Sequence, residues 1–155
     1  MLIVRGRPAL SAARRARMFA KAKAVADGLA MIDTCFVHVV VSDHELTAAE
    51  RAQLDQMLTY GPRVEPMSPA GSMISAPVSA AAERKVLWVA PRLGTTSPWS
   101  SKATDIAHVC GLSAVKRIER VLEYTLHGTA LDVAAIGRAL SDRMTESVIV
   151  DEREL

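Results

Sequence analysis

The chain has 155 residues, a length typical of one domain with a single core. Half of its residues are hydrophobic and 23% are charged, a balance typical of a folded globular protein. A net charge of +2 is too small to favour nucleic acid as the main partner, and two cysteines are too few for a disulfide framework. No apolar run approaches the ~20 residues of a membrane-spanning helix. We therefore expect a cytoplasmic protein that binds neither nucleic acid nor a membrane.

The first sixty residues predict two strands and two helices in alternation. A strand over 2–4 precedes a helix that Ser11 caps, and this helix is expected to end between Gly28 and Asp33. Its apolar stripe comprises Met18, Ala22, Val25 and Leu29. The β-branched run 34–42 predicts a central strand. Thr47 and Glu50 then form a capping box for a helix that buries Leu54, Met57 and Leu58 and ends at Gly61-Pro62.

After a connector rich in Pro, Ser and Ala over 63–84, the pattern repeats. A strand over 85–91, a loop over 92–102 and a helix over 102–110 lead to a strand over 115–126. The even positions of that strand are apolar and the odd ones polar, with Arg120 as the exception on the apolar side, which predicts burial of one face. Residues 129–132 resemble a capping signature for a helix. Its apolar stripe comprises Val133, Ile136, Gly137, Leu140 and Met144. A short strand over 147–150 and a charged tail follow.

This order predicts an α+β fold with an antiparallel sheet and helices packed on one of its faces. Two β-α-β-α halves, 1–62 and 85–150, are expected to share the sheet and to form one domain over 1–150.

The loop over 94–102 is the most unusual segment, because it places a tryptophan, a lysine and several hydroxyls before a helix. Such a loop can offer backbone N–H groups and hydroxyls to an anion or to a carboxylate of a partner. Alternatively, residues 97–101 cap the helix while Trp99 folds back onto the core. The loop lacks the glycine spacing of a nucleotide cradle.

Other reactive side chains have structural explanations. His108 and Cys110 are two positions apart, and Cys35 and His38 are three apart, without a third ligand or an orienting carboxylate. Buried cysteines usually act as small hydrophobic residues.

The basic stretch between Arg5 and Lys23 contains no acidic residue, and we interpret it as a solvated helix face. We predict no catalytic residue and no metal site in this chain.

Four stretches resemble one known family. They are the segment 91–108, which contains Ser-Pro-Trp-Ser-Ser-Lys-Ala-Thr-Asp at 97–105, and the shorter segments 5–11, 58–62 and 142–146. Together they are similar to the N-terminal region of the large, single-chain formylglycinamide ribonucleotide amidotransferase of purine biosynthesis, also called phosphoribosylformylglycinamidine synthase. The resemblance covers essentially the whole chain.

The resemblance implies a place in a larger enzyme, in which a glutaminase domain releases ammonia and a synthetase domain uses it with ATP and magnesium. The N-terminal region is similar to a fused dimer of the small accessory subunit of multi-subunit versions, which is not a catalyst. Nothing in this chain matches the glutaminase nucleophile elbow or a glycine-rich ATP loop, so we expect an inactive fragment without a cofactor of its own, with 151–155 beginning a linker.

The leading hypothesis is a scaffold whose partners are the synthetase and glutaminase domains of the same polypeptide. The residues expected at the interface are Ser97, Trp99, Ser100, Ser101, Lys102, Thr104, Asp105 and Arg143. The alternative is a regulatory module in which the same loop and Arg120 bind a phosphate-bearing metabolite.

Overall fold

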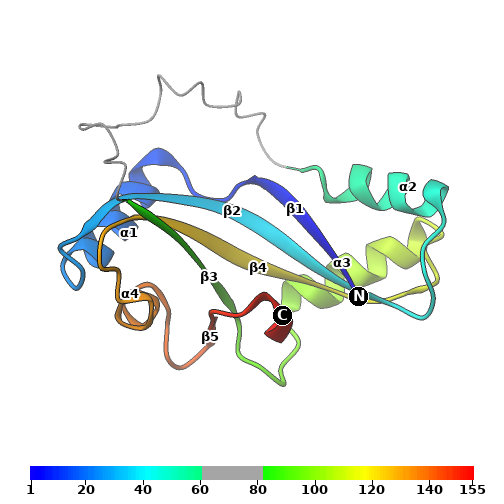
Figure 1. The fold of residues 1–155 in the computed structure, drawn as a ribbon. Coiled ribbons are helices and arrows are strands. Elements are labelled where there is room, and N and C mark those ends of the chain that lie inside the picture. The colour runs from blue at the N-terminus through cyan, green and yellow to red at the C-terminus, as the bar shows by residue number, and fades with distance from the viewer. Residues whose placement is uncertain (61–81) are drawn as a thin grey trace.

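A computed structural model describes residues 1–60 and 82–155. Across these two ranges, strands and helices alternate from β1 to β5 and end in a short 3₁₀ turn, η2 (Figure 1). The elements are β1 (Leu2–Pro8), α1 (Ala12–Lys23), β2 (Leu29–Ser42), α2 (Ala48–Leu58), β3 (Glu83–Pro91), α3 (Pro98–Val109), β4 (Val115–Gly128), α4 (Val133–Leu140), β5 (Glu146–Ile149) and η2 (Glu152–Glu154).

The five strands form one antiparallel sheet in the order β1-β2-β4-β3-β5. The two 14-residue strands β2 and β4 lie at its centre, where Val37 pairs with Val121 and His38 with Arg120. β1 flanks β2 as β3 flanks β4, so the two β-α-β-α units occupy matching positions about the central pair. The predicted antiparallel α+β fold is confirmed.

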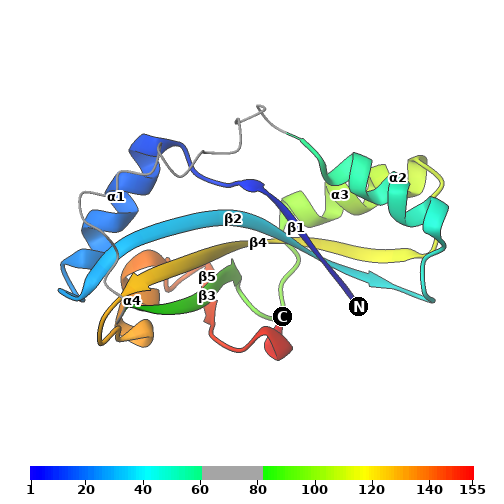
Figure 2. The same ribbon diagram turned by 45° about the horizontal axis from the view of Figure 1, so that its top comes forward.

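The helices pack on one face of this sheet, as the sequence predicts. α1 and α4 cover one end, where Ala22 and Ile136 meet Leu126 of β4 in one buried cluster. α2 and α3 cover the other end, where Leu54 and Ala107 pack with other buried side chains (Figures 1 and 2). Complete burial of a leucine contributes about 1.5–3 kcal/mol, so these two clusters hold the helices in place.

The opposite face of the sheet is buried as well, which corrects the expectation for β4. Glu119 and Glu123, on its polar side, are only 9% and 5% exposed. They lie on the same face as the buried residues Val37, Val39, Trp88, Ala90, Val121 and Ile149. The C-terminal residues cover this face, because Leu155 packs against that cluster and Arg5 of β1 contacts Glu152 of η2. Residues 152 and 155, in the segment where we expect a linker to begin, thus contact the sheet.

The first helix ends earlier than predicted, and the following strand begins earlier. α1 starts after Ser11 as expected but ends at Lys23, and Leu29 already belongs to β2. Just before β2, the chain approaches the segment after β4 closely, and the Thr129 N–H donates to the Gly28 carbonyl at 3.0 Å. A Cβ on Gly28 would lie 1.9 Å from the Thr129 oxygen, so only glycine fits.

The second half departs from the prediction at several element boundaries and in the apolar stripe of its last helix. β3 begins at Glu83, two residues before the expected start, and α3 begins at Pro98, because Ser97 caps it. Asp132 caps α4, and Met144 is 76% exposed and outside the buried stripe.

In the first half, the capping box of α2 is confirmed, with Leu54 and Leu58 buried and Met57 partly buried. Its predicted stop at Gly61-Pro62 lies outside the described residues, as does most of the connector.

Candidate functional site

The predicted binding loop is held by its own helix cap. Ser97 adopts an extended backbone conformation, and its Oγ accepts a hydrogen bond from the Ser100 N–H at 3.0 Å. The same hydroxyl donates to Glu119 Oε1 at 2.7 Å, and the Ser97 N–H donates to Glu119 Oε2 at 3.4 Å. The loop thus binds a carboxylate, as one reading of its composition suggests, but this carboxylate belongs to the protein itself.

Glu119 is the centre of this arrangement. Its Oε2 also accepts from Arg117 Nη2 at 3.0 Å, and its Oε1 accepts from the backbone N–H of Arg120 at 3.0 Å. Burial alone would raise the pKa of Glu119, but the hydrogen bonds from Ser97, Arg117 and the Arg120 backbone together lower it below its usual value. Glu119 is therefore a fixed anion that joins the loop to β4.

Thr104 makes a second link between α3 and β4. β3 pairs with β4 only as far as Val89 and Leu122, so the N-terminal part of β4 has no strand neighbour on that side. Thr104 Oγ1 occupies this edge and accepts from the Ile118 N–H at 3.1 Å, while it donates to the Ser100 carbonyl at 2.9 Å. The hydroxyl takes the place of a missing strand partner.

Trp99 folds back into an aromatic cluster, as the alternative reading of the loop predicts. Its ring centre lies 5.6 Å from that of His38 and 6.2 Å from that of Tyr60. His38 Nε2 and the Tyr60 hydroxyl are 2.8 Å apart. The Arg120 guanidinium lies over this group, 4.8 Å from the Trp99 ring centre. We call His38, Tyr60, Trp99, Arg120 and Phe36 the aromatic–arginine cluster.

His38 has the strongest electrostatic perturbation in this cluster. It is 1% exposed, and burial lowers its pKa to about 4, with a further contribution from the charge of Arg120. The imidazole is thus neutral at physiological pH. Cys35, on the opposite face of β2, donates from its Sγ to Glu123 rather than toward His38. The two side chains do not form a thiol–imidazole pair.

The predicted interface residues fall into two groups. Ser97, Trp99, Ser100 and Thr104 face the sheet, and Ser100 is fully buried. Ser101, Lys102 and Asp105 are exposed on the outer side of α3. Arg143 is also exposed, but it lies in the turn between α4 and β5 and not on α3.

Sequence reasoning missed a polar network on the far face of the sheet. Glu123 Oε2 accepts from Trp88 Nε1 at 2.9 Å and from Arg5 Nε at 3.3 Å. Cys35 Sγ lies 3.4 Å from Glu123 Oε1, and burial first, then this carboxylate, raises the pKa of Cys35 to about 12. The sequence signal for this network was the pair of glutamates at odd positions of β4. Their alternation with apolar residues predicted that they face solvent instead.

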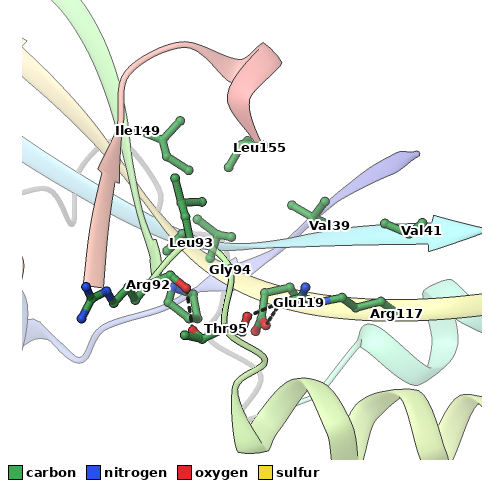
Figure 3. Close-up of a pocket in the computed structure, with 13 residues that line it drawn as sticks. Val39, Val41, Arg92, Leu93, Gly94, Thr95, Arg117, Glu119, Ile149 and Leu155 are labelled. Atoms are coloured by element: carbon green, nitrogen blue, oxygen red, sulfur yellow. Dashed lines mark hydrogen bonds and ion pairs between the residues drawn. The ribbon is translucent and has the colours of Figure 1, made fainter. Parts of the chain in front are cut away.

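A hollow of about 150 Å³ lies on the same far face (Figure 3). Val39, Val121 and Ile149 contribute to its apolar lining, and Leu155 borders it. Arg117 and Glu119 also line it, but they pair with each other, so this ion pair is already satisfied (Figure 3). The hollow therefore provides a concave, largely apolar surface, and the acid and base in its lining are already bound to each other.

Within residues 1–60 and 82–155, no group of three or more His, Cys, Asp or Glu side chains is placed to hold a metal ion. No helix of that part of the chain has the length and hydrophobicity to cross a membrane.

A comparison with known protein families identifies a family that matches most of the chain. The model of the family described as "formylglycinamide ribonucleotide amidotransferase N-terminal" matches residues 35–155, a range that includes the central strands, α3 and the C-terminal turn. This range is more than half of the chain and includes every predicted interface residue. The chain therefore belongs to the N-terminal domain family of formylglycinamide ribonucleotide amidotransferase, an enzyme of purine biosynthesis.

Proposed function

We propose that this domain is a noncatalytic scaffold that docks the synthetase and glutaminase domains of the amidotransferase and helps ammonia to pass between them. The observation that carries the proposal is the two-sided character of α3. Its inner side is fixed to β4 through Ser97 and Thr104. Its outer side exposes Lys102, Asp105 and two apolar side chains, Ile106 and Val109.

The buried reactive groups favour a structural role over a catalytic one. A thiol with a pKa of about 12 is protonated at neutral pH, so Cys35 is a poor nucleophile. His38 is neutral, but only 1% of its surface is exposed, so a substrate cannot reach it without a rearrangement. Both groups are occupied by neighbours of their own chain.

The outer side of α3 has the composition of a docking surface. Ile106 is 46% exposed and Val109 is 88% exposed, and they are one helical turn apart. Lys102 and Asp105 provide polar groups beside them, as in the rim of an interface. Because α3 is already anchored to β4, binding through this side costs little conformational entropy. We assign it to contact with the other domains of the same enzyme.

The test compares two nitrogen sources in the full-length amidotransferase. Ile106→Glu should lower glutamine-dependent activity about tenfold or more, because it places a charge in a desolvated contact. Activity driven by ammonium salts should stay within about twofold, because it does not need the transfer of ammonia between domains. Lys102→Ala should shift the ratio in the same direction by less.

Val25→Glu is the matched control. Val25 is 47% exposed, close to the value for Ile106, but it follows α1 at the other end of the sheet. This variant should leave both activities unchanged. Equal losses with glutamine and ammonium in Ile106→Glu, or the same loss in both variants, would contradict the proposal.

A further inference from the structure

Arg120 projects from the centre of β4 to the helix-covered face, where aromatic rings surround it. Its guanidinium carbon lies 4.4 Å from the ring centre of Phe36 and 4.8 Å from that of Trp99. The side chain is partly buried. Contacts with two rings stabilise the cation and fix the plane of its donors.

Within the described ranges, this guanidinium lacks the carboxylate partner that Arg5 of β1 and Arg117 of β4 have. Arg5 pairs with Glu123 at 3.2 Å, and Arg117 pairs with Glu119 at 3.0 Å, both with buried glutamates. Among residues 1–60 and 82–155, no carboxylate pairs with Arg120, and its single side-chain hydrogen bond goes to the Tyr60 hydroxyl at 3.4 Å. Most of its five N–H donors therefore have no acceptor in the described part of the chain.

The surrounding groups leave the positive charge uncompensated. His38, which pairs with Arg120 across the strands, is neutral and turns its Nε2 toward Tyr60. The loop hydroxyl of Ser97 is taken by Glu119, whose side chain lies on the other face of β4. A partly buried cation with free donors and no anion is a ready site for an external oxyanion.

We propose that Arg120, framed by Phe36, Trp99 and Tyr60, binds a phosphate group of a small phosphate monoester. The guanidinium donates to two phosphate oxygens from its free edge, and the Tyr60 hydroxyl lies beside it as a further polar group. Ser97 takes no part, because its hydroxyl and backbone N–H bind Glu119. This inference is independent of the scaffold role, since it concerns the sheet-facing cluster and not the outer side of α3.

The experiment titrates the 155-residue chain with inorganic phosphate and with ribose 5-phosphate by calorimetry, at constant ionic strength set with chloride. Ribose 5-phosphate should bind saturably and should raise the midpoint of thermal unfolding, whereas chloride should not. Inorganic phosphate should bind at the same site. Competition between the two probes shows whether the phosphate group alone provides the recognition.

Arg120→Gln should weaken binding about tenfold or more, because it removes charged donors to the oxyanion. Arg120→Lys should also weaken binding, because an ammonium group cannot offer two parallel donors while stacked on the rings. Lys116→Gln is the control: Lys116 also lies on β4, but it is exposed and pairs with Asp43. It should leave the affinity within about twofold.

Three results would overturn the proposal. The first is the absence of saturable binding, and the second is an equal loss in Arg120→Gln and Lys116→Gln, which would indicate general screening of positive charge. The third concerns Glu65, the first acidic residue after Tyr60 in the sequence. If Glu65→Gln lowered stability as much as Arg120→Gln while phosphate stabilised neither variant, Arg120 would belong to an internal ion pair.

Discussion

The link between Thr104 and the unpaired edge of β4 can be tested by removing one hydroxyl. Thr104→Val keeps the shape of the side chain but leaves the Ile118 N–H without its acceptor at 3.1 Å. Ile118 is fully buried, so water cannot replace the lost bond without a rearrangement. A buried donor without a partner costs about 1–3 kcal/mol. We expect the free energy of unfolding to fall by about 2 kcal/mol.

In a domain of this size, that loss corresponds to a decrease of about 4–8 °C in the midpoint of thermal unfolding. Urea denaturation should show a lower midpoint with an unchanged slope. Hydrogen exchange gives the local measurement, because the Ile118 amide should exchange faster in the variant. Thr104→Ser, which retains the acceptor oxygen, should preserve protection of this amide. Unchanged stability and unchanged Ile118 exchange in Thr104→Val would refute the role assigned to the hydroxyl.

Two further predictions follow from the shifted pKa values. At pH 8 a maleimide should label the exposed Cys110 rapidly and Cys35 only after unfolding. The reason is that burial raises the pKa of the Cys35 thiol to about 12. Equal labelling rates of the two cysteines in the folded protein would contradict this prediction. The pKa of His38 is about 4 when folded and about 6.5 when unfolded, so its contribution to stability is complete above pH 6.5 and decreases as the pH falls toward 4. Urea titrations between pH 7 and pH 4 should show this decrease, and His38→Gln should reduce the slope in that window.

Local signals in the sequence predicted the elements that depend on neighbouring residues. The side chains of Ser11 and Thr47 both cap helices where expected, because a cap needs only partners three residues away. The alternation in β4 correctly identified the face that carries Ile118 and Leu126. Helix caps and strand alternation were therefore sufficient to place the antiparallel sheet and the helix-covered face.

Features that depend on distant contacts could not be predicted in this way. The burial of Glu123 follows from Trp88 and Cys35, which are 35 and 88 residues away in the chain. The early start of β2 depends on the approach of Gly28 to Thr129 across the sheet. The residue type alone predicted solvent exposure for Glu123 and a longer helix before β2. In both cases a contact with a residue distant in the chain determined the observed structure.

The sequence motif at 97–105 places side chains on two sides of α3. Ser97 and Thr104 are required to join α3 to the unpaired edge of β4, so their presence is explained without any partner. Neither of these needs Lys102 or Asp105, which face outward from the same helix. If the domain had no partner, the residues on the outer side of α3 would not need to pack against anything. The exposed apolar side chains of Ile106 and Val109 would then only lower solubility. The motif therefore anchors the inner side of α3, and we propose that the outer side, which continues through Ile106 and Val109, is a contact surface.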